Sequence, residues 1–383
     1  MKPRLLVLDQ WARQALQAGT NKSWLYNGFD KIFDTCIVNA DTSLMNRLVG
    51  FSSLIKALIS RPTDLRCEYH RQLEWAAKTP SAFLARTIRF QKALDRLSGY
   101  DATFQVGCLF GPMTSSGMAA FSYHDQSVAM VERMWPEWLP RNFPKFRDRF
   151  LELERASLQA KDLVFTYSEV TRRSMIDDYA LPSHKVMVAP TACKISYPSV
   201  DQVLADRAPK LLFAGTDFLQ KGGDLVLNAF KALRRQRRDL ELVLVGAAPL
   251  EPLPEGARHL GMVSFDKLIS EYLSATLILH PARHDAFPNV LKEALACGLP
   301  AVTSDSVGIS EIITNGETGI VLKHNEVQAI VEAVGDLLDD SERLRAMRER
   351  CLVERERFRP TSCVARITDA MRGVMDAKGR LHA

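Results

Sequence analysis

The stretch 276–304 limits most strongly what this chain can fold into. It reads TLILHPARHDAFPNVLKEALACGLPAVTS. The apolar run 276–280 predicts a buried strand, and a short loop then leads into a helix that starts near Asn289. The Gly-Leu-Pro sequence at 298–300 ends that helix, and the apolar residues 301–304 predict a second strand. Such a strand–loop–helix–strand unit is typical of a parallel sheet, which binds ligands at its carboxyl edge in open α/β folds.

Two acids stand in the loop and the first helical turn of this unit. Asp285 and Glu293 are eight residues apart, and they do not share a helix face. They can therefore bind two ends of one ligand. The unpaired amides at the start of the helix, at Val290, Leu291 and Lys292, are expected to face the same edge, where they would suit a diphosphate.

This pattern resembles the signature of the family 4 retaining glycosyltransferases (glycosyl transferases group 1), which have the GT-B fold. The signature is an acid, then Phe-Pro-Asn, then a Glu eight positions after the first acid. The resemblance implies that Asp285 and the backbone of Phe287 and Asn289 hold the donor sugar, and that Glu293 holds the nucleotide ribose. Asp285 stands where Glu is usual, which shortens the reach by one methylene. The alternative interpretation is an ordinary β–α unit with solvated acids.

A second motif follows the predicted strand KLLFAG at 210–215. In the resembling family, the loop after this strand supplies an Arg and a Lys to the donor diphosphate. Lys221 stands at the lysine position and Thr216 at the arginine position. Lys221 is therefore expected to be the main cation that neutralises the leaving phosphate without a metal ion. The alternative is a solvated lysine before a helix.

Two further segments of the second half resemble parts of the donor site. Residues 259–263 resemble the strand end that holds the nucleotide base through backbone groups, which points to Met262 and Val263. The turn at 190–194 resembles the hinge of the family, with Lys194 where an acid is usual.

The first half predicts a sheet of its own. The apolar runs 4–9 and 102–106 predict buried strands, and a strand at 118–122 is followed by His124 and Asp125. His124 matches the family position beside the donor sugar and the acceptor, where it could bind a hydroxyl or stabilise charge. A lone histidine at a strand end is also often structural. Asp125 is a weaker candidate for a base or an acceptor contact.

The excess of basic residues lies in the first half. Residues 1–200 hold 26 Lys and Arg against 19 Asp and Glu, and the whole chain has a net charge of +5. Such a charge suits an anionic acceptor or a membrane surface, although solubility alone also explains it. Residues 81–97 predict an amphipathic helix, which either lies on an anionic membrane or packs on the core. Its apolar side is expected to hold Phe83, Leu84, Ile88 and Leu94, with Arg86, Arg89, Lys92 and Arg96 elsewhere. No motif indicates nucleic-acid binding.

The seven cysteines are scattered, odd in number and without a CxxC pair, which favours a reducing compartment and argues against structural zinc. No apolar stretch approaches the roughly 20 residues of a membrane-spanning helix. The sequence therefore predicts a cytoplasmic protein, with peripheral association at the inner face of the membrane as a further possibility.

Together these patterns predict an α/β protein with two Rossmann-like domains, and the resemblance implies GT-B architecture, in which the two domains face each other across a cleft. The predicted domains are an acceptor-side domain at 1–192, a nucleotide-sugar domain at 193–362, and a helix at 363–383 that packs back on the first domain. The expected function is a retaining, metal-independent glycosyltransferase that needs no cofactor. Its expected partners are a nucleotide-sugar donor and a glycan, lipid-linked or small-molecule acceptor. His124, Asp285 and Lys221 are the predicted catalytic residues. The alternatives are an epimerase or phosphorylase of the same fold, and a binding module without activity.

Overall fold

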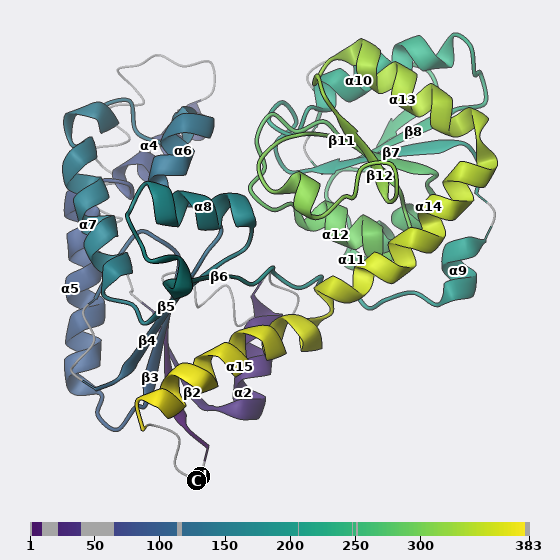
Figure 1. The fold of residues 1–383 in the computed structure, drawn as a ribbon. Helices are drawn as coiled ribbons and strands as arrows, with labels where there is room; N and C mark the ends of the chain where they lie inside the picture. The colour runs from purple at the N-terminus through teal and green to yellow at the C-terminus, as the bar shows by residue number, and fades with distance from the viewer. Residues whose placement is uncertain are drawn as a thin grey trace. The chain divides into compact units, whose positions relative to one another are not determined.

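The computed structural model describes residues 2–9, 22–39, 65–112, 117–205, 207–246, 248–249 and 252–379. The chain forms two compact units (Figure 1). Unit 1 consists of Met1–Pro190 together with Val364–Ala383, and unit 2 of Thr191–Cys363. The sequence had placed these boundaries at 192 and 362.

Unit 1 is built on a parallel sheet with the strand order β2-β1-β3-β4-β5-β6 among its described residues. The strands are β1 (Arg4–Asp9), β2 (Asp34–Val38), β3 (Ala102–Val106), β4 (Ala119–His124), β5 (Leu163–Thr166) and β6 (Val186–Val188). The residues of β3, β4 and β5 are buried throughout, as expected for strands with helices on both faces.

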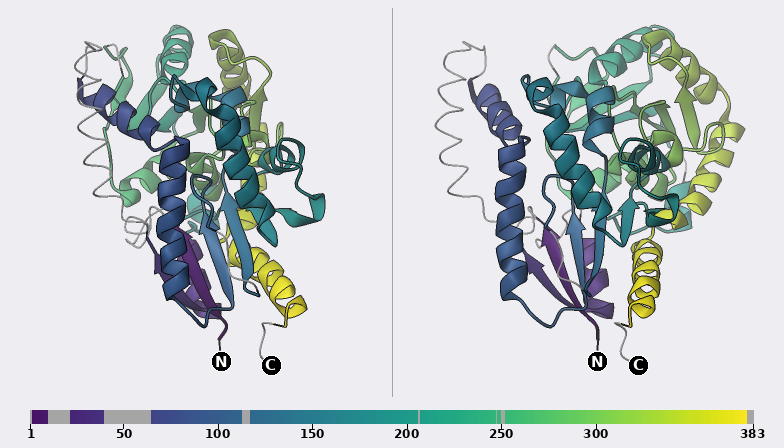
Figure 2. Two further views of the ribbon diagram at one scale, coloured as in Figure 1. Left: turned by 90° about the vertical axis from the view of Figure 1, so that its left-hand side faces the viewer. Right: turned by 60° about the vertical axis from the view of Figure 1, so that its left-hand side comes forward.

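Helices cover this sheet, and the long helix α5 runs along one side of it (Figure 2). The helices are α2 (Ser23–Ile32), α4 (Leu65–Ala76), α5 (Pro80–Arg96), α6 (Val128–Met134), α7 (Arg147–Gln159), α8 (Glu169–Asp177) and α15 (Pro360–Ala377), with short 3-10 turns η1 (Pro136–Trp138), η2 (Phe143–Lys145) and η3 (Ser183–Lys185). The C-terminal helix α15 packs on α2, where Gly28 leaves room for the side chain of Val364. Lys378, just after α15, forms an ion pair with Asp162.

Unit 2 has a second parallel sheet, in the order β12-β11-β10-β7-β8-β9. Its strands are β7 (Lys210–Gly215), β8 (Glu241–Gly246), β9 (Ala257–His259), β10 (Leu277–His280), β11 (Ala301–Ser304) and β12 (Gly319–Leu322). Its helices are α9 (Val200–Leu204), α10 (Gly223–Arg234), α11 (Phe265–Ser274), α12 (Asn289–Ala296), α13 (Val327–Asp339) and α14 (Ser341–Glu354), with η4 (Ile309–Glu311) and η5 (Arg355–Phe358). The chain runs from β7 outward to β9 and returns to β10 on the other side of β7. The strand order therefore reverses between β7 and β10, and ligands bind at such a point in open α/β sheets.

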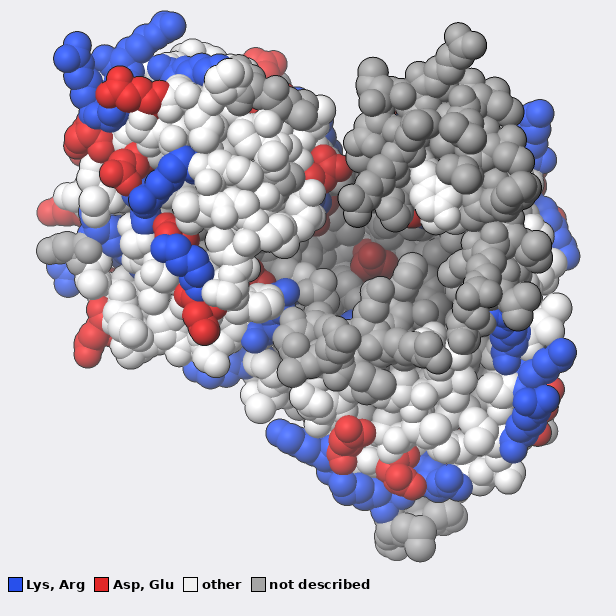
Figure 3. Space-filling view, turned by 180° about the vertical axis from the view of Figure 1, so that it is seen from behind, with Lys and Arg blue, Asp and Glu red and all other residues white. Residues whose placement is uncertain are grey.

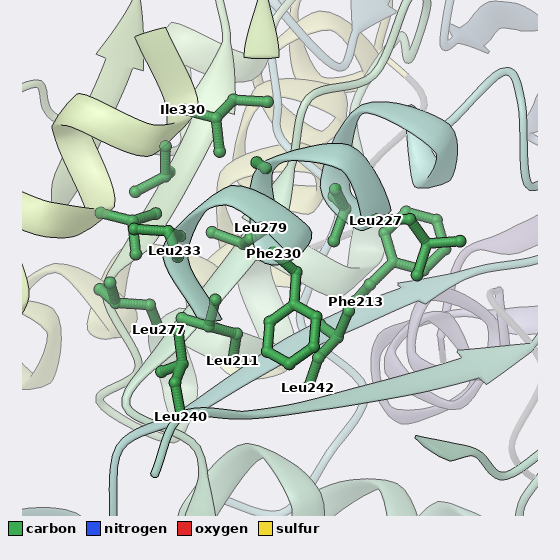
Figure 4. Close-up of a cluster of buried hydrophobic side chains, with 14 of the residues drawn as sticks. Leu211, Phe213, Leu227, Phe230, Leu233, Leu240, Leu242, Leu277, Leu279 and Ile330 are labelled. Atoms are coloured by element: carbon green, nitrogen blue, oxygen red, sulfur yellow. The ribbon is translucent and has the colours of Figure 1, made fainter. Parts of the chain in front are cut away.

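The main core of unit 2 lies between this sheet and the helices α10 and α13 (Figure 4). Leu211 and Phe213 of β7 and Leu279 of β10 meet Phe230 of α10, and all four are fully buried. Ile330 of α13 closes the cluster from the other helix. This packing holds β7 and β10 beside each other below the carboxyl edge of the sheet.

Most of the predicted elements are confirmed, because buried parallel strands read as continuous apolar runs. Two of the differences concern candidate site residues. β4 continues through His124, because the parallel ladder with β5 extends to the pair His124 and Thr166. β9 ends at His259, so Met262 and Val263 lie in the connection to α11 rather than in a strand.

The predicted faces of α5 are confirmed for Phe83 and Leu94 but wrong for Leu84, Ile88 and Arg86. Phe83, Arg86, Phe90 and Leu94 form the buried side, whereas Leu84 and Ile88 are exposed. Arg86 enters the core because its guanidinium donates hydrogen bonds to the carbonyl oxygens of Leu109, at 2.8 Å, and Ala77, at 2.6 Å. Charge alone does not reveal such a partner, so the sequence placed Arg86 outside.

Gly222 is required where the loop after β7 approaches the loop after β10. It has a φ of 78°, and a Cβ atom there would lie 2.1 Å from the carbonyl oxygen of Pro281. Both the left-handed backbone and the close approach exclude a side chain.

Gly222→Ala is therefore expected to lower the free energy of unfolding of unit 2 by about 3–5 kcal/mol, since it adds a backbone clash to a left-handed conformation. Gly316→Ala is the matched control, because Gly316 has a φ of 81° but nothing near the position of a Cβ atom. It should cost only about 1–2 kcal/mol. Chemical denaturation measures both, and equal losses would contradict the close approach.

Candidate functional site

The strand-order reversal in unit 2 brings two predicted site residues into contact. Lys221 follows β7, Asp285 follows β10, and the two strands pair directly. The ammonium of Lys221 lies 2.8 Å from Oδ2 of Asp285. It also donates a hydrogen bond of 3.3 Å to the carbonyl oxygen of His284. The sequence predicted each residue separately, and the structure shows that they form one ion pair.

A second group contacts the same carboxylate oxygen. Nε2 of His280, the buried last residue of β10, lies 3.3 Å from Oδ2 of Asp285. Burial alone would raise the pKa of Asp285, but the hydrogen bond from His280 and the positive charge of Lys221 outweigh it and lower the pKa to about 2. Asp285 is therefore a carboxylate throughout the physiological pH range. His280 was not among the predicted site residues, although the sequence shows a histidine at the end of an apolar strand.

Glu293 has two partners of its own. Its side chain is 3% exposed, Tyr272 of α11 donates a hydrogen bond of 2.9 Å to Oε2, and the ammonium of Lys194 lies 3.8 Å from Oε1. The Lys194 ammonium also lies 4.4 Å from the centre of the Phe265 ring. Lys194 belongs to the turn 190–194 that resembles the family's hinge. This turn therefore supplies a cation to Glu293, the residue predicted to bind the ribose. Tyr272 gave no signal, because its position depends on the packing of α11 against α12.

The start of α12 lies between Asp285 and Glu293 in the sequence. The helix begins at Asn289, as predicted, after Pro288, which has no amide proton to leave unpaired. Asn289 and Val290 are half-buried, and the side chain of Leu291 is fully buried. Phe287 is buried and packs edge-on against Phe358 of η5. These contacts fix the first turn of α12 beside Asp285.

The remaining predicted residues of unit 2 lie around this centre. Thr216, directly after β7, is exposed. Met262 is 77% exposed, and Val263 is half-buried. No contact in the described part of the chain assigns a role to any of these three residues.

Lys292 is a fully buried cation in this region. Its ammonium donates hydrogen bonds to the hydroxyl and the carbonyl oxygen of Thr191, and it lies 5.0 Å from the centre of the Phe287 ring. Burial lowers the pKa of Lys292 to about 8. The sequence analysis considered only its backbone amide.

Unit 1 has a pocket of about 180 Å³ at the carboxyl edge of its sheet. It is lined by Lys22, Val106, Gly107, Cys108, Leu109, Tyr123, Asp125, Gln126, Trp138 and Tyr167. It combines a carboxylate, a lysine, an amide and aromatic rings. Such a lining can bind polyhydroxylated ligands by hydrogen bonding and stacking.

The lysine of this pocket is held by an acid that the sequence analysis read only as the end of a strand. Asp9, the buried last residue of β1, accepts hydrogen bonds from the hydroxyl of Tyr26 and from the ammonium of Lys22, the latter at 2.9 Å. An acid at the end of a buried strand is a signal that could have predicted this network.

The structure places His124 inside unit 1 rather than among the residues that line the pocket. Its side chain is 1% exposed, and neither ring nitrogen has a hydrogen-bond partner among the described residues. Burial and, to a smaller extent, the charge of Lys161 lower the pKa of His124 to about 3, so the ring is neutral. The neighbouring Asp125 lines the pocket instead. A catalytic role for His124 stays a prediction.

No group of three or more His, Cys, Asp and Glu side chains in the described ranges is arranged to hold a metal ion. Three lysines of the described chain, at positions 194, 221 and 292, lie near the start of α12.

Known proteins resemble both the sequence and the fold. Residues 199–351 match the family model "Glycosyl transferases group 1". A GDP-mannose-dependent alpha-(1-6)-phosphatidylinositol monomannoside mannosyltransferase from Mycolicibacterium smegmatis is 34% identical over 33% of this chain and 38% of its own length. The O-antigen chain mannosyltransferase B of Escherichia coli is 24% identical over 66% of this chain and 69% of its own length.

The fold similarity extends over nearly the whole chain. The crystal structure of WaaG, a glycosyltransferase involved in lipopolysaccharide biosynthesis, superimposes with a TM-score of 0.63 at 15% identity and covers 96% of this chain and 100% of its own. The predicted α/β class with two Rossmann-like domains is thereby confirmed. By sequence, this chain spans about two fifths of the first relative and two thirds of the second.

The buried ammonium of Lys292 predicts a pH dependence of stability. Below about pH 8 both the folded and the unfolded chain hold the proton, whereas between about 8 and 10.5 the unfolded chain binds it more tightly. Folding stability should therefore rise over this window by about 3 kcal/mol from this group. Urea unfolding of the wild type and of Lys292→Met across pH 7–10.5 isolates the effect, since Lys78 and Lys161 are common to both. Parallel pH profiles would contradict the prediction.

The buried ring of His124, unpartnered among the described residues, predicts that replacing it with an apolar side chain does not destabilise the fold. A buried imidazole without a partner costs about 1–3 kcal/mol, so His124→Leu should leave the free energy of unfolding unchanged or raise it. Tyr123→Phe is the control in the same strand, because the hydroxyl of Tyr123 donates a bond of 2.8 Å to the carbonyl oxygen of Ala189. That variant should lose about 1 kcal/mol. A large loss for His124→Leu, measured by thermal unfolding, would indicate a partner.

Proposed function

We propose that this chain is a retaining glycosyltransferase, and the match of residues 199–351 to the family model "Glycosyl transferases group 1" supports the proposal. The proposed reaction moves a sugar from a nucleotide-diphosphate sugar to a glycan, lipid-linked or small-molecule acceptor. The observation that supports it most is the convergence of Lys221, Asp285 and Glu293 at the carboxyl edge of one sheet, around the start of α12. Neither a metal ion nor a cofactor is part of the proposal.

The donor would bind to unit 2. Lys221 and the amides at the start of α12 would neutralise the diphosphate, which becomes the leaving group. Glu293 would accept hydrogen bonds from the ribose hydroxyls, and Tyr272 and Lys194 would hold its carboxylate in place. The name of the mannosyltransferase from Mycolicibacterium smegmatis makes a GDP-sugar the first donor to examine.

The acceptor would bind to unit 1, in the pocket that Asp125 and Trp138 line. Asp125 could accept a hydrogen bond from the attacking hydroxyl, and Trp138 offers an aromatic surface to a sugar ring. Lys78 lies 3.7 Å from the centre of the Trp138 ring and fixes the ring in place.

Two other functions compete with this proposal. An epimerase or phosphorylase of the same fold would convert the donor without an acceptor, or would require free phosphate. A binding module without activity would retain the nucleotide site but release no product. Measurements of binding and of product formation on the same preparation separate the three.

Peripheral binding to an anionic membrane also remains a prediction. Helix α5 exposes Leu84 and Ile88 together with Lys92 and Arg96, but it buries Arg86. The face of the molecule drawn in Figure 3 shows basic and acidic side chains interspersed. No described helix has the length and apolar character needed to cross a bilayer. A cytoplasmic location is proposed from the cysteines, because those at 36, 108, 193, 297, 351 and 363 are free thiols.

Glu293→Gln tests the donor site. The variant should lose about 2–3 kcal/mol of affinity for the nucleotide sugar, because a charged acceptor for the ribose hydroxyls is removed from a buried position. Glu271→Gln is the matched control, since Glu271 is an equally buried glutamate, 3.1 Å from Lys210 and outside the proposed site. Calorimetry and donor hydrolysis with UDP-, GDP- and ADP-sugars, without added metal, provide the measurement.

Hydrolysis of one donor by the wild type and by Glu271→Gln, but not by Glu293→Gln, is the expected result. Binding without hydrolysis or transfer to any acceptor would favour the binding module. If no nucleotide sugar binds to the wild type, the proposed function is wrong.

A further inference from the structure

Asp285 and Lys221 form a direct ion pair, which the resemblance to the family does not imply. That resemblance assigns Asp285 to the donor sugar. In the structure, Oδ2 of Asp285 accepts from the ammonium of Lys221 at 2.8 Å and contacts Nε2 of His280 at 3.3 Å. The side chain of Asp285 is 16% exposed and that of Lys221 is 18% exposed, so water screens their charges weakly.

The geometry also limits what Lys221 can offer to a diphosphate. An ammonium has three N–H donors. One is directed to Asp285 and one to the carbonyl oxygen of His284. The carboxylate cancels the charge that a phosphate would otherwise meet, so a bound phosphate must share the ammonium with Asp285 or displace it.

We propose that Asp285 acts on the diphosphate end of the donor site through Lys221. Its carboxylate and the diphosphate compete for one ammonium, and the competition weakens the binding of the nucleoside diphosphate that remains after sugar transfer. His280 is a positioning residue that keeps the carboxylate turned toward Lys221. This inference rests on the proposed function, and it assigns to Asp285 control of product release in addition to the sugar contact that the resemblance implies.

The length of the side chain supports this role. An aspartate at 285 reaches Lys221 and His280 from the loop after β10, and both contacts converge on a single oxygen. A second carboxylate close by, Asp224 at the start of α10, pairs instead with Arg283 at 2.7 Å. Asp285 and Asp224 therefore each have their own cation, and of these two pairs only the one with Lys221 contains a predicted phosphate ligand.

The experiment compares nucleoside diphosphate with nucleotide sugar as ligands for the wild type, Asp285→Asn, Lys221→Met and the double variant. Asp285→Asn should bind the nucleoside diphosphate about tenfold more tightly, because one negative charge beside the phosphate is removed while the lysine stays. In the Lys221→Met background the same substitution should change this affinity by less than about twofold. Steady-state turnover should fall and inhibition by the nucleoside diphosphate should strengthen in Asp285→Asn.

Asp224→Asn is the matched control, since it removes a carboxylate from the neighbouring ion pair without freeing Lys221. Its affinity for nucleoside diphosphate should stay within about twofold of the wild type. Asp285→Glu keeps the charge, so it should not tighten nucleoside diphosphate binding. Thermal unfolding of each variant shows whether it is folded.

Two results of the binding comparison would overturn the inference. If Asp285→Asn leaves the affinity for nucleoside diphosphate unchanged and weakens only the nucleotide sugar, Asp285 contacts the sugar. If the tighter binding persists without Lys221, Asp285 repels the phosphate directly and the ammonium is not shared.

A titration of Asp285 without any ligand tests the ion pair independently of the proposed function. Carbon-13 NMR of the Asp285 carboxyl should give a pKa near 2 in the wild type, as the structure indicates, and a higher one in Lys221→Met. An unchanged pKa overturns the pairing, even if Asp285→Asn does not fold. Failure of the wild type to bind any nucleotide overturns the proposed function instead.

Discussion

The parallel pairing of β7 with β10 is the constraint on which the candidate donor site depends. Leu211 pairs with Leu277 and Leu212 with Ile278, all of them buried. This register places the loops after the two strands side by side, although 64 residues separate Lys221 from Asp285. The glycine at 222 allows the loops to approach closely. Packing in the core therefore creates an electrostatic contact at the surface of the sheet.

The charged groups of this site are arranged as pairs of opposite sign. Lys221 is paired with Asp285, and Lys194 lies near Glu293. Pairing makes it possible to keep charges in a weakly hydrated place, where an isolated charge would be costly. An anionic ligand that binds one of these lysines must therefore compete with the carboxylate that is paired with it. Lys292 differs, because its hydrogen bonds go to the neutral oxygens of Thr191, and burial lowers its pKa.

Unit 1 also has an acid near the end of each of two strands, but only one of these acids is paired with a lysine of the described chain. Asp9 at the end of β1 holds Lys22, whereas Asp125 at the end of β4 lines the open pocket. A polar residue near the end of a buried strand is available to a ligand at the carboxyl edge only if its side chain faces solvent and not the core. His124, still within β4, is turned into the core, and Asp125, one position later, is not.

The sequence by itself determined the class of the fold, most strand boundaries and the separate candidates Lys221, Asp285 and Glu293. Apolar runs, glycine and proline act locally, so their effect is visible in a single segment. The tertiary structure alone decided the partners. His280, Tyr272 and Lys194 joined the site, Arg86 moved into the core and His124 left the pocket edge, because these outcomes depend on contacts between segments far apart in the chain. Side-chain partners across a sheet edge follow from register and helix packing, and a linear pattern contains neither.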